Sequence, residues 1–471
     1  MPDACPIWSL RDLYEGIDSP AVQTDIATCR KAALALAADW QGKIATIASA
    51  AEPQAGDVVV DTLLPALANL HSHSFQRAMA GMTEYRAQDR ESFWTWRTLM
   101  YRFLDHLSPD HIAAIAALTF MEMQKAGYAA VGEFHYVHHQ PGGQAYDNPA
   151  ELSLQIIQAA ALTGIGLTHL PVLYTYGGLQ AQPLAGGQLR FGNSVDAFCG
   201  IVSLSHKAMA ALPADTCIGI APHSLRATSE SDLRQALDLH VGMPVHMHIA
   251  EQTKEVEEVA ALRGARPVEW VLGQCAVNEQ WCLIHATHMT ESETAALAKS
   301  GAVAGLCPIT EANLGDGIFN GANYVAHGGT FGIGSDSNVN ISLTEELRTL
   351  EYSQRLRDRQ RNVMVAAAGS VGDALYFGAA KGGAQALARD AGRIEVGALA
   401  DLVAIDTTDP AICALSDQQL LDGLVFAAKD TVVTDLWSAG RHQVRDRRHI
   451  AEDEIIAAYR KAITDLTRRL G

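Results

Sequence analysis

The sequence has little positive charge, no long hydrophobic run and no paired cysteine motif. Its 35 lysine and arginine residues are outnumbered by 53 aspartate and glutamate residues, giving a net charge of −18 at pH 7. This balance argues against binding to nucleic acid or to a membrane surface, because both require clustered positive charge. No uninterrupted apolar stretch reaches 18 residues, so we expect no membrane span, and we expect no signal peptide.

The eight cysteines are scattered and include no C-x-x-C pair. Reduced, buried thiols are usual for such residues in a cytoplasmic protein, and we expect that location here. The content of 48% hydrophobic and 19% charged residues is typical of a globular enzyme. The length of 471 residues favours two or three domains, although one α/β barrel can exceed about 250 residues.

Eight short apolar segments recur between about residues 60 and 340, separated by stretches with helical periodicity. Such runs are typical of buried parallel strands, and the stretches between them can supply crossover helices. Eight units are the number that closes a (β/α)8 barrel; an open doubly wound sheet gives the same alternation, but its ligand site uses fewer strand ends. The predicted strands are 58–73, 128–136, 166–174, 217–224, 244–251, 281–288, 302–313 and 331–338.

The flanking segments differ in pattern. Strand-like pieces occur before residue 64 and again in 393–445, including 424–426, whereas 24–40 has helical periodicity. Residues 452–470 are predicted as an amphipathic helix that packs against the rest. The expected fold class is therefore α/β, a (β/α)8 TIM-like barrel beside a small β domain built from N- and C-terminal segments. The predicted barrel is 65–385, and the small domain combines 1–64 with 386–471.

Polar residues at the ends of the apolar segments indicate the chemistry. His71 and His73 are one residue apart on an expected strand, so their side chains point to the same side. His248, His285 and Asp336 end later segments, and the carboxyl ends of barrel strands meet at one face. Three imidazoles with a carboxylate or water suit Zn²⁺ or a similar divalent ion. The pattern predicts one catalytic metal ion, because no lysine stands at a strand end to bridge two.

Two further residues, His246 and Glu251, are considered by position. His246 shares a strand face with His248, but His248 is nearer to the strand terminus, which favours it as the ligand. An acid such as Glu251 is usually a solvated surface side chain, but beside a metal site it is a candidate proton shuttle. In a chain of net charge −18, an anionic substrate would need a local patch of arginines.

Several segments carry a resemblance to a known family. The H-x-H, H-x-x-E, later His and Ser-Asp pattern resembles the amidohydrolase superfamily in its mononuclear deaminase branch, and residues 392–403 are similar to its C-terminal β-domain signature. Within that superfamily the chain most resembles the formimidoylglutamate deiminases, which act in histidine breakdown. The segments that carry this closer resemblance are 69–81, 132–139, 171–174, 221–226 and 248–252.

The resemblance implies hydrolytic deamination of the small dicarboxylate N-formimino-L-glutamate to N-formyl-L-glutamate and ammonia. The attacking hydroxide would be activated by one divalent metal ion, with Zn²⁺ favoured. The metal ligands it implies are His71, His73, His248 and Asp336. The proton-transfer residues it implies are Glu251, His285 and Asp336. The residues it implies around the substrate are Gln76, Arg97, Tyr136, His223 and Arg226. We also expect a homodimer.

Two other functions stay open at this point. A nucleobase deaminase, related to guanine or cytosine deaminases, would keep the metal ligands but would favour an aromatic slot, for which Trp94 and Trp96 are candidates. A barrel that has lost catalysis and serves as a binding protein is the second alternative. The complete set of metal-competent residues argues against it, because a scaffold has no reason to hold them all.

Overall fold

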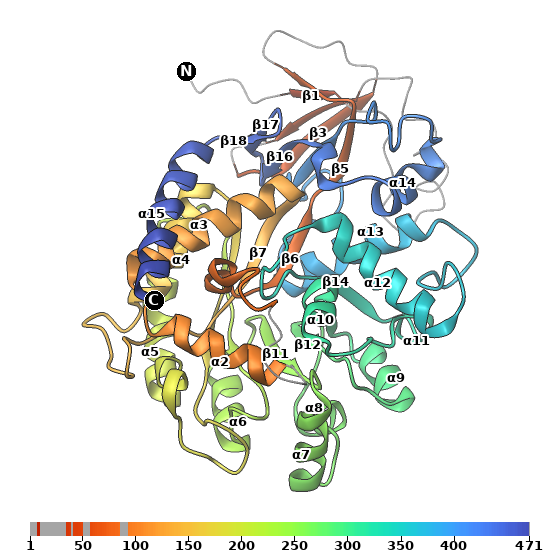
Figure 1. Ribbon diagram of the computed structural model, residues 1–471. Coiled ribbons are helices and arrows are strands. Elements are labelled where there is room, and N and C mark those ends of the chain that lie inside the picture. The colour runs from red at the N-terminus through yellow and green to blue at the C-terminus, as the bar shows by residue number, and fades with distance from the viewer. Residues whose placement is uncertain (1–6, 10–33, 39–40, 50–56, 85–92, 471) are drawn as a thin grey trace.

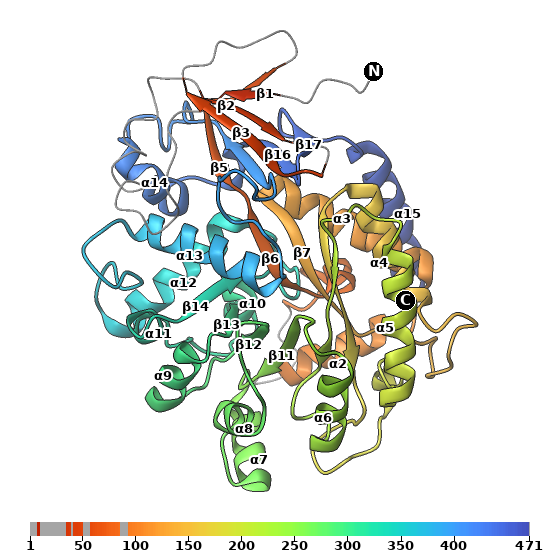
Figure 2. The ribbon, with the colours of Figure 1, turned by 180° about the vertical axis from the view of Figure 1, so that it is seen from behind.

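The computed structural model of the protein describes residues 7–9, 34–38, 41–49, 57–84 and 93–470. It has mixed α and β content, with a layer of helices around the central strands (Figure 1). The strands from the N-terminal region and from residues after 400 gather at one end of the molecule, and α7 and α8 lie at the other end (Figure 2). Among the described residues, no helix has the length and apolar character needed to cross a bilayer.

The centre consists of parallel strands that are almost completely buried. The first sheet contains β6 (Leu67–Ser72), β7 (Tyr128–His135), β8 (Gly166–Leu173), β9 (Cys217–Ile218) and β10 (Ala221–Pro222). The second sheet contains β11 (Val245–Ile249), β12 (Trp281–His285), β13 (Val303–Leu306) and β14 (Thr330–Ile333). Parallel bridges join Ser72 to Asp336 and Ile220 to Val245, so the pairing continues from each sheet to the other on both sides. Burial on both faces explains the continuous apolar runs in the sequence.

Helices alternate with these strands and cover them. The helices of the described residues are α2 (Phe93–Leu104), α3 (Pro109–Ala126), α4 (Glu151–Thr163), α5 (Val195–Met209), α6 (Glu230–Leu239), α7 (Thr253–Arg263), α8 (Pro267–Gln274), α9 (Glu291–Lys299), α10 (Pro308–Leu314), α11 (Gly321–Ala326), α12 (Leu343–Asp358), α13 (Val371–Ala386), α14 (Leu420–Phe426) and α15 (Glu452–Leu470). Several begin at a hydroxyl residue; for example, Ser229 and Thr290 accept a backbone N–H from the first turns of α6 and α9. The predicted terminal helix is α15, and it packs along α3.

Strands from both ends of the chain share one antiparallel sheet. Its order is β18 (Arg448–His449), β17 (Arg441–Arg445), β16 (Val433–Ser438), β15 (Leu402–Ile405) and β5 (Thr62–Pro65). The other terminal sheet contains β3 (Ile44–Ser49), β2 (Leu34–Ala38), β1 (Ile7–Ser9) and β4 (Val58–Val59). The pairing of Leu402 with Pro65 places the start of the C-terminal sheet directly beside the chain that enters β6.

Three secondary-structure predictions are wrong in whole or in part. The predicted strand 302–313 ends with β13 at Leu306, and Pro308–Leu314 form helix α10. Residues 34–38, predicted as helix, form strand β2 between β1 and β3; the rest of 24–40 lies outside the described residues. Alanine and leucine favour helix, but pairing with two neighbouring strands outweighs this weak preference. Residues 424–426, predicted as strand, lie in helix α14, where Leu420, Leu421, Leu424 and Val425 are buried at helical spacing.

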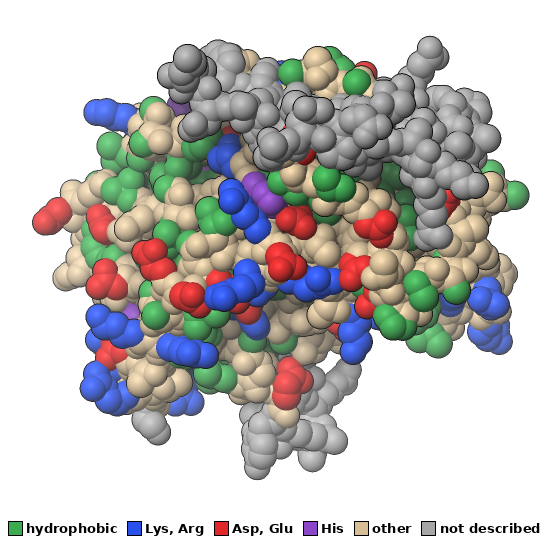
Figure 3. Space-filling view, turned by 90° about the horizontal axis from the view of Figure 1, so that it is seen from above, with side chains coloured by type: hydrophobic (Ala, Val, Ile, Leu, Met, Phe, Trp, Pro, Cys, Tyr) green, Lys and Arg blue, Asp and Glu red, His purple; other side chains and the backbone are tan. Residues whose placement is uncertain are grey.

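The face seen in Figure 3 carries both signs of charge. On its described part, lysine and arginine side chains lie among aspartate and glutamate side chains rather than in a patch of their own. The expected absence of nucleic-acid binding stays a prediction. The predicted cytoplasmic location and homodimeric state stay predictions.

A buried ion cluster ties the segment after α13 to the sheets. Arg389 Nη2 donates to Asp401 Oδ1 and Asp215 Oδ2, both at 2.8 Å, and Arg441 Nη1 donates to Asp215 Oδ1 at 2.7 Å. Burial alone would raise the pKa of Asp215. The hydrogen bond and charge of Arg441, together with Arg389, outweigh burial and lower that pKa below its usual 3.8. Asp215 therefore contributes stability at neutral pH that is lost as the pH falls through its lowered pKa.

We expect Arg389→Met to lower the free energy of unfolding by about 3–5 kcal/mol, because Asp401 would stay buried without its cation. Equilibrium urea denaturation followed by circular dichroism at pH 7 measures this change. Arg393→Met is the matched control, since the ion pairs of Arg393 with Asp390 and Glu395 are solvent-exposed. Such exposed pairs contribute about 0–1 kcal/mol. Equal stability losses in the two variants would contradict the prediction.

Candidate metal centre and active site

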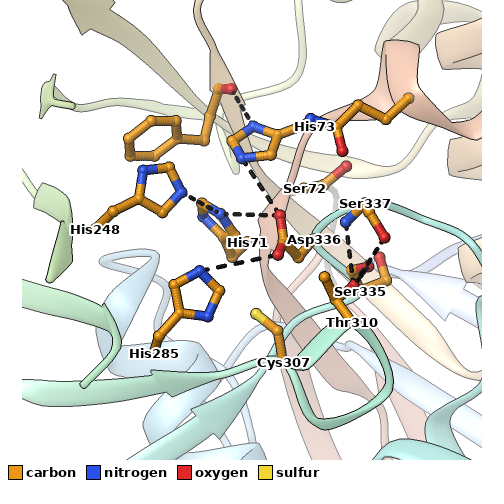
Figure 4. Close-up of polar contacts among 12 residues, drawn as sticks. His71, Ser72, His73, His248, His285, Cys307, Thr310, Ser335, Asp336 and Ser337 are labelled. Atoms are coloured by element: carbon orange, nitrogen blue, oxygen red, sulfur yellow. Dashed lines mark hydrogen bonds and ion pairs between the residues drawn. The ribbon is translucent and has the colours of Figure 1, made fainter. Parts of the chain in front are cut away.

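Three histidines and one aspartate converge at the C-terminal ends of the central strands (Figure 4). His71 and His73 come from the end of β6, and His248 comes from β11; their ligand nitrogens lie within 4.8 Å of one another. The Nε2 atoms of His71 and His248 are 3.0 Å apart. Asp336 follows β14, and its Oδ1 lies 3.6 Å from His71 Nε2 and 3.3 Å from His73 Nε2. The structure thus brings together the four residues predicted as metal ligands.

Burial disfavours the protonated form of these three imidazoles. Burial lowers the pKa of His71 to about 3, and burial likewise lowers the pKa values of His73 and His248. A neutral ring facing a carbonyl must donate, so His73 Nδ1–H donates to Phe134 O at 2.9 Å, and His248 Nδ1–H donates to His223 O at 3.2 Å. Both Nε2 atoms are therefore left unprotonated and directed inward. Converging unprotonated nitrogens and a carboxylate fit a divalent cation, which would offset their mutual repulsion.

Close backbone packing fixes the position of Asp336. A Cβ at Gly334 would lie 2.8 Å from the backbone nitrogen and oxygen of His71, so only glycine allows β14 to approach β6 here. Asp336 itself has a left-handed φ of +44°, which is uncommon for a non-glycine residue. Asn338 Nδ2 donates to the backbone oxygen of Asp336 at 2.9 Å and to Ser72 Oγ at 3.2 Å. Strain of this kind persists only where surrounding contacts impose it, and it is frequent at active sites.

His285, the last residue of β12, faces the same centre with a different charge. Its Nε2 lies 3.9 Å from Asp336 Oδ2, and its Nδ1–H donates to Glu311 Oε1 at 3.2 Å. Burial alone would lower the pKa of His285. The hydrogen bond to Glu311 and the charges of Glu251 and Asp336 outweigh it and raise the pKa to about 10. His285 can therefore act as an imidazolium donor, unlike the three neutral histidines.

A cavity of about 600 Å³ opens beside the centre. It is lined by every residue predicted around the substrate: Gln76, Arg97, Tyr136, His223 and Arg226. Glu251, His285 and Asp336 also line it. Trp96 is on its wall, whereas the side chain of Trp94 lies outside the described residues. His246 does not line it; His246 Nε2 contacts Ala386 O at 2.8 Å, which agrees with the choice of His248 over His246 as a ligand.

Two contacts of Arg226 were not expected from the sequence. Arg226 Nη2 donates to Glu251 Oε2 at 3.1 Å, and its Nε lies 3.7 Å from Glu255 Oε2. Burial opposes the charge of Arg226, but Glu255 and Glu251 outweigh this and raise its pKa. Arg226 is thus a buried cation that also orients the candidate proton shuttle. Glu255 and Glu311 are the acids that sequence reasoning missed; each is a helix residue whose partner is identified only by the folded arrangement.

Similarity to known proteins agrees with this arrangement. Residues 62–442 match the amidohydrolase family model. A formimidoylglutamate deiminase of Pseudomonas aeruginosa is 47% identical over 427 residues, which are 90% of this chain and 94% of the relative. A 5-methylthioadenosine/S-adenosylhomocysteine deaminase of Natronomonas pharaonis is 27% identical over 85% of this chain and 86% of the relative.

Solved structures give the same result for the fold. An amidohydrolase from Brucella melitensis superposes with a TM-score of 0.88 at 43% identity, covering 92% of this chain and 96% of that one. An adenosine deaminase from Xanthomonas campestris with bound zinc superposes with a TM-score of 0.75 at 21% identity, covering 93% and 94%. The family match, the identity and the superposition extend over most of the chain. The protein belongs to the amidohydrolase family.

Proposed function

We propose that this protein hydrolyses N-formimino-L-glutamate to N-formyl-L-glutamate and ammonia. One observation carries the proposal: a cluster of neutral histidines with Asp336 adjoins a cavity into which two arginines, Arg97 and Arg226, are built. Two guanidinium groups suit a substrate with two carboxylates, because each can bind one carboxylate bidentately. The identity to the P. aeruginosa deiminase supports the same substrate. A nucleobase deaminase would not require paired arginines.

We infer the domain architecture from the pairing of the strands. The continuous parallel pairing from β6 through β14 and back to β6 supports a (β/α)8 barrel over residues 65–385. The sheet that joins β5 to β15–β18 supports a small β domain built from 1–64 and 386–471. In such barrels the reactive residues lie at the C-terminal ends of strands, which agrees with the positions of His71, His248 and Asp336.

The metal site is inferred from its donor atoms. We propose that His71, His73, His248 and Asp336 hold one divalent ion, and that Zn²⁺ is favoured because imidazole nitrogens dominate the set. Such an ion, when bound, lowers the pKa of water to about 7 and so supplies hydroxide near neutrality.

The protein residues then move the protons. Asp336 accepts the proton that water loses as its oxygen adds to the formimino carbon. His285, held as imidazolium by Glu311, donates a hydrogen bond to that oxygen and stabilises charge in the tetrahedral intermediate. Glu251, which lines the cavity, takes the hydroxyl proton of the intermediate and delivers it to the terminal nitrogen. The carbon–nitrogen bond then breaks, ammonia leaves and the remaining oxygen becomes the formyl carbonyl, while the proton held by Asp336 passes to solvent.

The test of this proposal is ammonia release by the zinc-loaded protein from N-formimino-L-glutamate, with guanine and cytosine assayed in parallel. We expect release from formiminoglutamate alone, with N-formyl-L-glutamate as the second product, and we expect a chelator to abolish it. Release from a nucleobase instead would reject the dicarboxylate substrate and keep the metal site. Release from none of the three, with metal bound, would reject the proposed function.

We expect Arg226→Met to lower kcat/KM for formiminoglutamate by about 100-fold or more, with metal content unchanged. Truncating one partner of a buried charged contact costs about 2–5 kcal/mol, and this variant removes the contact with Glu251 as well as one carboxylate site. Steady-state kinetics with metal analysis measure the effect. Arg234→Met is the matched control, because Arg234 lies exposed on α6. Near-normal kinetics for Arg226→Met would remove Arg226 from the site.

A further inference from the structure

Tyr174 follows β8 and lines the cavity, although its side chain is only 4% exposed. Its ring packs edge-on against His223, with centroids 4.6 Å apart, and tilted against Phe191 at 5.5 Å. Its backbone N–H donates to Asn193 Oδ1 at 3.0 Å. The ring is therefore held from two sides, and the direction of its hydroxyl is set by the fold.

Two donors approach the Tyr174 hydroxyl oxygen. Arg97 Nη2 donates to it at 3.2 Å, and Gln188 Nε2 donates to it at 3.3 Å. The orientation of the Gln188 amide is fixed independently, because its Nε2 also donates to Gly177 O at 2.9 Å while its Oε1 accepts Ala185 N–H at 3.1 Å. Neither a guanidinium nor an amide nitrogen can accept a hydrogen bond. The hydroxyl proton of Tyr174 is thus directed to neither neighbour and is available to a third group.

The cavity is where such a group would bind. Arg97, Arg226 and Tyr174 all line it, so an anion beside Arg97 would meet the Tyr174 hydroxyl as well. A carboxylate accepts through both oxygens, and a neutral hydroxyl beside a guanidinium adds a directional donor without adding charge. Hydrogen bonds to charged groups are stronger than those between neutral groups, and a hydroxyl oriented in advance loses little entropy on binding.

We propose that Tyr174 is a further substrate-binding residue, whose hydroxyl donates a hydrogen bond to the same substrate carboxylate that Arg97 binds. The proposal rests on the proposed function for the identity of the substrate. Gln188 is a positioning residue in this arrangement, since it acts through the Tyr174 hydroxyl and through Gly177. Tyr174, oriented by Gln188, makes the cavity selective for a carboxylate at one defined position. This selectivity adds to the general attraction that the arginines exert on anions.

The first test is kinetic and compares Tyr174→Phe with wild type. We expect the KM for N-formimino-L-glutamate to rise about 10- to 100-fold, the effect of losing a hydrogen bond to a charged group, with kcat within about threefold. N-formimino-4-aminobutyrate and N-formimino-2-aminobutyrate each lack one carboxylate. For one of the two, Tyr174→Phe should leave kcat/KM unchanged, which identifies the carboxylate that Tyr174 contacts. An equal loss on all three substrates would overturn the proposal, because the hydroxyl would then act only through the fold.

The second test measures binding without turnover. Isothermal titration of N-formyl-L-glutamate should show a Kd about 10- to 100-fold weaker for Tyr174→Phe than for wild type. Arg97→Met should raise the Kd too. In the double variant the Kd should rise by less than the product of the two single-variant increases, because both residues bind one carboxylate. Tyr459→Phe, on α15 outside the cavity, is the control.

The two tests separate the two proposals. If the wild type binds the dicarboxylate and Tyr174→Phe weakens it, Tyr174 is a carboxylate ligand even if formiminoglutamate is not turned over. The assignment of Tyr174 would be overturned if Tyr174→Phe and wild type bound the dicarboxylate equally well. It would also be overturned if the increase in Kd of the double variant equalled the product of the two single-variant increases. Absence of dicarboxylate binding by the wild type would overturn it as well.

Discussion

Asparagine in place of Asp336 is expected to lower kcat about a thousandfold or more. The carboxylate lies 3.3 Å from His73 Nε2 and 3.9 Å from His285 Nε2, so it adjoins both the neutral ligand cluster and the imidazolium. Burial alone would raise the pKa of Asp336, but His71 and His73 outweigh it and keep that pKa below its usual value. Asparagine keeps the shape and loses both the charge and the ability to accept water's proton. Steady-state ammonia release, with metal content measured on the same preparation, gives the result.

The matched control is Asp390→Asn, which makes the same change at a half-exposed carboxylate paired with Arg393 on the surface. It should leave turnover within about twofold, as expected for a surface pair. Because the backbone of Asp336 donates to His71 O at 3.0 Å and accepts from His73 N–H at 2.9 Å, the loop should keep its place in the variant. Turnover of Asp336→Asn within tenfold of wild type would show that Asp336 has no part in proton transfer.

The position of the site could be predicted because its residues end buried parallel strands. His71, His248 and Asp336 each follow an apolar run that the core requires, and the run itself gives the position in the fold. The two-residue spacing of His71 and His73 fixed their common direction. Arg97 and Arg226 were harder to predict from position, because loop arginines are usually on the surface.

The supporting residues could not be predicted, because their partners are distant in sequence. Asn69 Oδ1 accepts the backbone N–H of Ser335 at 3.1 Å across 266 positions, and Glu311 meets His285 across 26. A buried asparagine and a helical glutamate have no local pattern that separates them from ordinary polar residues. The fold errors have the same origin: β2 is a strand because β1 and β3 flank it, and its own composition favours helix.

Glutamine in place of Glu251 is expected to keep the metal and to lower kcat by about 10²- to 10⁴-fold, the usual contribution of a positioned acid or base. Glutamine retains an oxygen that can accept from Arg226, which lies 3.1 Å away in the native protein, so the side chain should stay in place. It cannot deliver a proton to the leaving nitrogen. Single-turnover ammonia release is the direct measurement, because it reports on bond cleavage rather than on product release.

The comparison with Glu257→Gln makes this result specific. Glu257 lies on α7 and its side chain is exposed, so the same substitution there should leave kcat unchanged. KM should change little in Glu251→Gln, because Arg97 and Tyr174, which we propose as ligands of a substrate carboxylate, line the cavity unchanged. A variant that loses its metal would make Glu251 a ligand rather than a proton carrier. A variant with normal kcat would show that Glu251 does not deliver the proton.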